Sequence, residues 1–261
     1  MSQFFFIFTL ITLFMFTGCN QKNIKEDVKL VTNSFLQTKL GTIENKKLIT
    51  KLPEIKKTIV VKKVNKRVNI SVQQKKQRFN NILVPIITEV YNTLQTQYLN
   101  VKSDIEKGKN QEFIEKLKIE YKAKTNEKLL QALKPHPISI ALAQAAIESA
   151  WLTSRFTIKA NNIFGVWSFR SNEPRIEANS TRGDRKIYLK KYKTYKAAVT
   201  DYYKNLAKNW AYYEFREQRT LSDDPYYLVQ FLESYSEKKE RYTKLLAKMI
   251  EYNKFYEYDI K

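Results

Sequence analysis

The feature that most constrains the fold is an apolar stretch at 138–152, ISIALAQAAIESAWL, which contains a single carboxylate. A segment that is apolar nearly all round is typical of a helix buried at the centre of a protein. An ionised carboxylate at Glu148 is costly there unless it is paired or keeps its proton. Gln144 precedes it by four residues and so shares its face of the helix. We therefore expect a central helix with one acid in an unusual environment.

Segments with helical spacing of apolar residues lie on both sides of this stretch. Pro85 falls early in the first of them, and we expect it in the first turn. The expected helices cover 80–108, 110–124 and 126–134 before the central helix, and 195–210, 224–235 and 239–256 after it.

The segment between the central helix and residue 195 is irregular and contains Gly165, Pro174 and Gly183. Residues 185–192, RKIYLKKY, alternate apolar and charged side chains, which indicates a half-buried strand. The sequence therefore predicts an α+β, mainly α fold. A helical lobe and a small β-containing lobe are expected to flank a cleft, with Glu148 near its edge.

The scarcity of cysteine and histidine excludes several kinds of site. Cys19 is the only cysteine and His136 the only histidine. An intrachain disulfide, a thiolate metal cage and a histidine-rich metal site are therefore excluded, and we expect no metal and no cofactor. His136 lies between Pro135 and Pro137, where we expect it to begin a helix and not to act as a catalytic base.

The N-terminal region has the pattern of an exported protein. Residues 4–16 are apolar and uncharged, too few for a comfortable membrane span but suited to a signal peptide. The following FTGC resembles the lipobox of bacterial lipoproteins, which implies cleavage before Cys19 and lipidation of its thiol. No lysine or arginine precedes Phe4, so an uncleaved membrane anchor is the alternative. We expect a signal peptide at 1–18, a lipidated basic tether at 19–75 and the folded domain at 76–261.

The net charge is strongly positive, with 47 Lys and Arg against 26 Asp and Glu, or +21. Such an excess favours a polyanionic partner, and nucleic acid, anionic lipid and bacterial cell-wall polymer all qualify. An export signal argues against nucleic acid. We therefore expect binding to the cell wall and membrane attachment through the lipid anchor, by a monomer that binds no nucleic acid.

Glu148 fits the chemistry of glycoside hydrolysis, which requires a carboxylic acid that is still protonated near neutral pH. Apolar surroundings achieve this because they disfavour the charged form. An exposed position at the end of a helical stripe, or one half of an ion pair, is the alternative for a glutamate in such a pattern.

The wider sequence resembles a known family. ALAQAAIESAW at 141–151 and NNIFGVW at 161–167 resemble the glucosaminidases of glycoside hydrolase family 73, and most closely the Bax-type branch, also labelled mannosyl-glycoprotein endo-β-N-acetylglucosaminidase-like. YKTYKAAVTDYYKNL, YYEFREQR and YSEKKERYTKLL follow in the same order, so the resemblance covers about residues 80–255.

The resemblance implies a lysozyme-like fold and cleavage beside N-acetylglucosamine in peptidoglycan, with Glu148 as general acid. Two positions depart from the pattern. The family commonly has glycine after the Glu-Ser pair and after the tryptophan, where this chain has Ala150 and Leu152.

The second catalytic group stays open at the level of sequence. Inverting glycosidases use a base carboxylate and retaining ones a nucleophile. Glu173, Glu177 and Asp184 in the β lobe are candidates, and we place Glu177 first because it lies midway along that lobe. The substrate's own 2-acetamido group could replace an enzyme nucleophile.

Aromatic and amide side chains supply the remaining candidates. The tyrosine of the family's last motif falls on Tyr242, with Tyr235 as the other possibility, and its role would be to orient the acetamido group or the developing charge. Three aromatic residues are candidates for stacking on sugars, with core packing as the alternative: Phe164, Trp167 and Tyr188. Asn162 either binds substrate or caps a turn.

The sequence thus predicts a peptidoglycan hydrolase of the endo-β-N-acetylglucosaminidase type in the cell envelope, anchored by lipid and facing the periplasm. One alternative is a lytic transglycosylase or muramidase, which cuts the other bond of the repeating disaccharide. A lipoprotein that only binds the wall, without cleaving it, is the non-enzymatic alternative.

Overall fold

The structure is a computed structural model that describes residues 71–182 and 185–259, except for the side chains of 180–182 and 185. Cys19, the expected signal peptide and nearly all of the expected tether lie outside the described residues, as does Asp184. In the described part of the chain, no helix is both long enough and apolar enough to cross a membrane.

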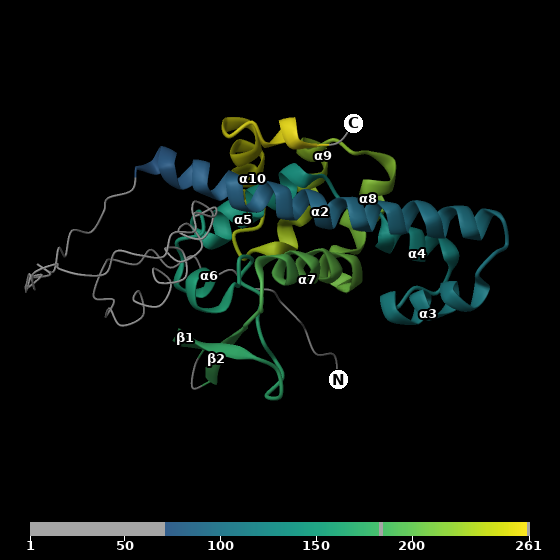
Figure 1. Ribbon diagram of the computed structural model, residues 1–261, viewed down its shortest axis with the longest axis horizontal. Helices are drawn as coiled ribbons and strands as arrows, with labels where there is room; N and C mark the ends of the chain where they lie inside the picture. The colour runs from purple at the N-terminus through teal and green to yellow at the C-terminus, as the bar shows by residue number, and fades with distance from the viewer. Residues whose placement is uncertain (1–70, 183–184, 260–261) are drawn as a thin grey trace, which may run out of the picture. The chain divides into compact units, whose positions relative to one another are not determined.

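The described residues form a mainly helical domain with one small sheet (Figure 1). Its elements are, in chain order, α2 (Val72–Glu106), α3 (Gln111–Tyr121), α4 (Asn126–Leu133), α5 (Ile138–Ser149), α6 (Arg155–Ala160), β1 (Arg175–Arg182), β2 (Arg185–Lys190), α7 (Tyr195–Lys208), η1 (Trp210–Tyr212), α8 (Tyr213–Leu221), α9 (Pro225–Leu228), η2 (Val229–Tyr235), α10 (Glu240–Tyr252) and η3 (Phe255–Tyr258).

The long helix α2 begins earlier than the sequence pattern indicated. Ser71 and Gln74 form a reciprocal capping box, so the helix begins at Val72 and not near residue 80. The expectation that Pro85 lies in the first turn is wrong, because it lies inside the helix. Packing outweighs the proline here, since one face of the helix is buried on both sides of it through Phe79, Leu83, Ile87 and Val90.

Helix α5 is the centre of the domain, as predicted. It packs against α2, α10 and η3, and ten of its twelve residues are buried. The main hydrophobic core surrounds it, with aromatic side chains from α7, α8 and α10. The helix ends at Ser149, three residues before the predicted end.

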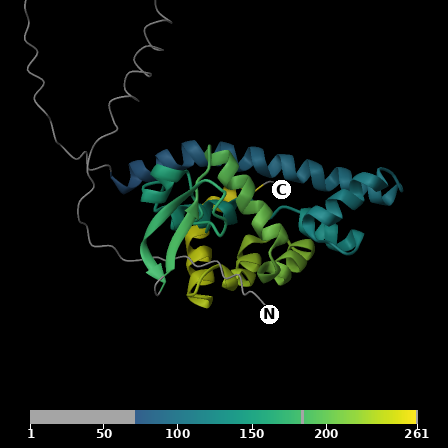
Figure 2. The same ribbon diagram turned by 90° about the horizontal axis from the view of Figure 1, so that it is seen from below.

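The β lobe is a single antiparallel hairpin. Glu177 of β1 pairs with Tyr188 of β2, and the register shifts between Glu177 and Thr181. The α+β, mainly α prediction is therefore confirmed. Figures 1 and 2 show the hairpin and the α3–α4 pair toward opposite ends of α2. The cleft expected between the two lobes stays a prediction.

Three consecutive residues in the left-handed region end α5. Ala150, Trp151 and Leu152 have φ of 50°, 61° and 63°. Ala150 and Leu152 are the two positions at which the family resemblance implies glycine. An L side chain in this region costs roughly 1–2 kcal/mol per residue, so the turn is held against its own backbone preference.

The side chain of Ser149 holds this turn. Its hydroxyl donates a hydrogen bond to the carbonyl of Ala145 at 2.5 Å and accepts one from the amide of Leu152 at 2.9 Å. The carbonyl of Ser149 accepts further bonds from the amides of Thr153 and Ser154. The residue after Glu148 therefore fixes the direction in which the chain leaves the helix.

The strain at Ala150 gives the first prediction. Ala150 is exposed, so Ala150→Gly should relieve the left-handed backbone without removing buried surface, and it should raise the free energy of unfolding by about 0.5–1 kcal/mol. The exposed Ala197 of α7 is the matched control, because glycine in a helix is destabilising and Ala197→Gly should lower stability. Denaturant unfolding measures both, and a loss of stability in both variants would contradict a strained turn.

Candidate active site

Glu148 is the penultimate residue of α5, at the point where the strained turn begins. Its side chain is half-buried. Its Oε1 accepts a hydrogen bond from the hydroxyl of Tyr242 in α10 at 3.0 Å. Within the described part of the chain, Oε2 has no hydrogen-bond partner. One oxygen of the carboxyl group is thus held by the protein, and the other is left to carry a proton or meet a ligand.

The environment of Glu148 favours its protonated form. Burial raises the pKa of this carboxyl group from 4.5 to about 8, while the hydrogen bond from Tyr242 and the charge of Lys238 act in the opposite direction. Most molecules therefore carry a proton on Glu148 at pH 7. A carboxylic acid that keeps its proton at neutral pH can give it to a leaving group, which is the property expected of a general acid.

A chain of buried polar side chains leads away from Glu148. Gln144 Nε2 donates to the hydroxyl oxygen of Tyr242 at 3.0 Å. The hydroxyl of Tyr202 in α7 donates to Gln144 Oε1 at 2.5 Å, and Nε2 of His136 lies 2.9 Å from the same Tyr202 oxygen. All four of these supporting side chains are buried. The five groups form one continuous series from His136, two residues before α5, to Glu148 near its end.

Tyr235 and Phe164 lie in the core and pack against members of this hydrogen-bonded series. Tyr235 stacks on Tyr242 with ring centroids 5.6 Å apart, and its hydroxyl donates to the carbonyl of Phe164 at 3.3 Å. Phe164 is fully buried and stacks on Tyr202 at 3.9 Å. Core packing, the alternative stated for Phe164, describes its position, and sugar binding by either residue stays a prediction.

Asn162 caps the turn that follows α6. Its amide group donates to the carbonyls of Val166 and Lys190, and its Oδ1 accepts from the amide of Val166. Both amide protons are thus used in tying the turn to the end of β2. Turn capping, one of the two expected roles, is present, and substrate binding stays a prediction.

The β-lobe candidates lie on a different element from Glu148. Glu177 is exposed and pairs with Lys186 across the hairpin at 3.2 Å. Tyr188 and Trp167 are half-buried, and the guanidinium of Arg175 lies 4.0 Å from the Tyr188 ring. Of the sequence candidates, the structure therefore brings only Tyr242 into hydrogen-bond contact with Glu148.

Glu173, the other acid considered in the β lobe, is half-buried. Its carboxylate accepts a hydrogen bond from the hydroxyl of Ser168 at 2.7 Å. Among residues 71–182 and 185–259, no cluster of three or more His, Cys, Asp or Glu side chains is arranged to hold a metal ion.

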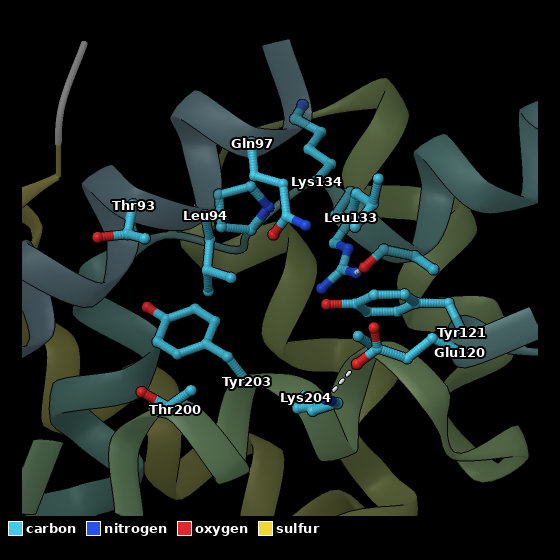
Figure 3. Close-up of a pocket in the computed structure, with 14 residues that line it drawn as sticks. Thr93, Leu94, Gln97, Glu120, Tyr121, Leu133, Lys134, Thr200, Tyr203 and Lys204 are labelled. Atoms are coloured by element: carbon cyan, nitrogen blue, oxygen red, sulfur yellow. Dashed lines mark hydrogen bonds and ion pairs between the residues drawn. The ribbon is translucent and has the colours of Figure 1, made fainter. Parts of the chain in front are cut away.

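A cavity of about 300 Å³ lies between α2, the α4–α5 junction and α7 (Figure 3), and Glu148 is not among the residues that line it. Tyr121 and Tyr203 form parts of its wall, and Lys204 and Glu120 pair at one side. Arg219 also lines it, but its guanidinium donates to the carbonyls of Gln131 and Ala132 at the end of α4. This places Arg219 as a cap of that helix.

Sequence reasoning missed two members of the hydrogen-bonded chain. Gln144 was placed on the face of Glu148 by its spacing, and Tyr242 came from the family motif. The sequence pattern indicates no separate role for Tyr202, which lies within the helix expected at 195–210, and it indicates His136 only as the start of a helix. Their contact joins residues 66 positions apart, and no local pattern signals it.

A comparison with protein-family models finds one match, to the family described as "Mannosyl-glycoprotein endo-beta-N-acetylglucosaminidase", over residues 123–255. The match covers just over half of the chain and contains Gln144, Glu148, Tyr202 and Tyr242. No curated protein matches the chain.

Three solved structures show partial likeness. They are a peptidoglycan hydrolase from Sphingomonas sp. A1 (23% identity, 49% of this chain and 86% of that one, TM-score 0.39), the catalytic domain of the autolysin Auto from Listeria monocytogenes (18%, 72% and 98%, 0.40), and a glycoside hydrolase domain of FlgJ from Salmonella typhimurium (23%, 55% and 96%, 0.38). All three TM-scores are below 0.5, so the family assignment of the chain rests on the match to the family model alone.

The raised pKa of Glu148 predicts a dependence of stability on pH. The folded state holds a proton on Glu148 that the unfolded state releases above about pH 4.5, so this group's contribution to stability is lost as pH rises from 4.5 toward 8. Glu148→Gln cannot titrate. Its stability relative to wild type should therefore rise, on the order of 1–3 kcal/mol, between about pH 5 and about pH 9.

Denaturant unfolding at the two pH values measures this difference, and Glu177→Gln is the matched control. Glu177 is exposed and paired with Lys186, so its replacement should not reproduce the trend. A difference between wild type and Glu148→Gln that stays the same at both pH values would show that the folded protein does not raise the pKa of Glu148.

Proposed function

The chain belongs to the glucosaminidase family, and from this premise we propose that it is a peptidoglycan hydrolase that cleaves glycosidic bonds beside N-acetylglucosamine. The observation that carries the proposal is the environment of Glu148. The family match comes from the sequence pattern, and the raised pKa of Glu148 comes from its burial in the fold. Together they support acid-catalysed cleavage of a sugar chain.

In this proposal Glu148 is the general acid. Its proton resides on Oε2, because Oε1 already accepts the hydrogen bond from Tyr242. As the glycosidic bond breaks, the proton passes from Oε2 to the leaving oxygen, and Glu148 becomes a carboxylate. The hydrogen bond from Tyr242 and the charge of Lys238 then stabilise that carboxylate. The site therefore stabilises the protonated form of Glu148 before proton transfer and also stabilises its carboxylate afterwards.

The second group of the reaction is proposed in two forms. Glu177 is the candidate carboxylate from the β lobe, where it pairs with Lys186. The alternative is the substrate's own 2-acetamido group, which needs no enzyme nucleophile. Trp167 and Tyr188 are half-buried on the same lobe and are proposed to contact the sugar rings.

The cellular setting is proposed from the sequence outside the described residues. The apolar stretch at 4–16 and Cys19 support export and a lipid anchor, by which the chain would act in the cell envelope as a monomer. The net charge of +21 supports attraction to the carboxylates of wall peptides. Assignment to the Bax-type branch within the family stays a prediction.

The test of the proposal is digestion of purified peptidoglycan. Glu148→Gln keeps the size of the side chain and its acceptor for Tyr242, but it has no proton to donate. Activity should fall by a factor of ~10²–10⁴, the usual loss for a general acid. Activity within about threefold of wild type would remove Glu148 from the mechanism.

Analysis of the new chain ends by mass identifies the bond. A reducing N-acetylglucosamine end supports the proposal, whereas a reducing N-acetylmuramic acid or an anhydro sugar would assign a muramidase or a transglycosylase. Binding to the wall without any new glycan chain ends would indicate a protein that binds the wall and does not cleave it. Glu177→Gln then distinguishes the Glu177 carboxylate from the 2-acetamido group of the substrate. A severe loss of activity is expected only if Glu177 is the second catalytic group.

A further inference from the structure

We propose that Gln144, Tyr202 and His136 are positioning residues that set the direction of the Tyr242 hydroxyl and thereby confine the acidic proton of Glu148 to Oε2. The proposal deepens the function proposed above and rests on Glu148 as the acid. It assigns a role to three buried side chains that make no hydrogen bond to Glu148 themselves and act on it through Tyr242.

The first link is at Tyr242. Its hydroxyl has one hydrogen atom and two neighbours, Gln144 and Glu148. Because the Nε2 of Gln144 donates to the hydroxyl oxygen, that side of the oxygen is occupied and the hydrogen atom points to Glu148 Oε1. An oxygen that already accepts this bond is a poorer place for the dissociable proton than Oε2.

The second link fixes the orientation of the Gln144 amide. If the amide turned over, its oxygen would face Tyr242 and accept the hydroxyl hydrogen, and Glu148 would lose its donor. The hydroxyl of Tyr202 prevents this, because it donates to Gln144 Oε1 at 2.5 Å. The amide can keep this bond only with its Nε2 toward Tyr242.

The third link is the contact between Tyr202 and His136. The only hydrogen atom of the Tyr202 hydroxyl goes to Gln144, so its oxygen accepts from His136 in the tautomer that carries the proton on Nε2. Burial, together with the nearby charge of Arg219, holds the pKa of His136 well below its usual range, so the ring is neutral with a single proton. Nδ1 has no hydrogen-bond partner within the described residues. All donors in the series therefore point toward Glu148.

Other charged or titratable groups lie near Glu148 but do not set this direction. The charge of Lys238 lowers the pKa of Glu148. The charge of Glu148 in turn raises the pKa of the surrounding hydroxyls, which are those of Tyr202, Tyr212, Tyr235 and Tyr242. In the structure only Tyr242 reaches the carboxyl group with a hydrogen bond among the residues described.

The neighbouring tyrosine supplies a matched control. Tyr202 and Tyr203 are adjacent in α7 and both buried, and both have rings packed on His136, at 5.5 Å and 4.3 Å. Their hydroxyls differ, because that of Tyr203 has no hydrogen-bond partner among the described residues. Phe164 stacks on the Tyr202 ring and should hold it in place when the hydroxyl is removed. Tyr202→Phe therefore removes a hydroxyl that belongs to the hydrogen-bonded series, and Tyr203→Phe removes an adjacent hydroxyl that does not.

The experiment measures the pKa of Glu148 in the full chain by NMR of carbon-13-labelled glutamate side chains, with Glu148→Gln identifying the signal. Tyr202→Phe should raise this pKa, because the hydrogen bond that favours the carboxylate is weakened, whereas Tyr203→Phe should leave it unchanged. On peptidoglycan, Tyr202→Phe should lower kcat about tenfold, with KM little changed and the alkaline limb of the pH profile moved upward.

Variants of His136, at the other end of the hydrogen-bonded series from Glu148, keep the proposal testable if Tyr202→Phe does not fold. His136→Gln retains an N–H donor toward Tyr202 and should keep the wild-type pKa of Glu148, while His136→Phe should raise it. Equal effects of the two tyrosine variants, or of the two His136 variants, would overturn the proposal. The NMR readout does not need hydrolysis, so it remains decisive even if Glu148→Gln shows that Glu148 is not the acid.

Discussion

The burial of one carboxyl group at the end of α5 is the constraint on which the rest of the site depends. Desolvation raises the pKa of Glu148 to about 8, and a single hydrogen bond from Tyr242 keeps the charged form within reach. A fully solvated glutamate would lose its proton far below neutral pH, and one buried without a donor would scarcely release it. The balance between these two effects gives the protein an acid that can cycle near neutral pH.

The turn after α5 explains how the group is held at that depth. Three left-handed residues follow Glu148 and Ser149, although none of them is glycine. The hydroxyl of Ser149 ties the turn to the helix, and Leu152 is buried beyond it. The backbone strain is therefore offset by packing and hydrogen bonds directly beside the acid. Strained backbone is common at functional sites, where it contributes to preorganisation, and here it lies beside the proposed acid.

Much of this site could be predicted from the sequence, because its main features are local. The nearly continuous apolar sequence of 138–152 predicted the buried helix, and the spacing of four residues put Gln144 on the face of Glu148. The alternation of apolar and charged residues at 185–192 predicted β2. The Tyr242 contact lies 94 residues away along the chain and came only through a family resemblance.

Features that depend on the whole fold could not be predicted in this way. Local sequence rules place Pro85 in the first turn of a helix, but burial of one face of α2 allows the helix to continue on both sides of the proline. The burial of Phe164 and Tyr235 in the core is another such feature, since composition does not distinguish a core ring from a surface one. His136 shows the same limit, because its role comes from a partner 66 residues away.

The central claim is that the fold keeps Glu148 protonated at neutral pH. An infrared difference spectrum between wild type and Glu148→Gln at pH 7 tests it most directly, because a protonated carboxylic acid and a carboxylate absorb at well-separated frequencies. We expect the wild-type protein to show the carbonyl band of one carboxylic acid that is missing from the variant and that disappears as the pH is raised through about 8. A carboxylate band in its place at pH 7 would contradict the claim and leave the site without its acid.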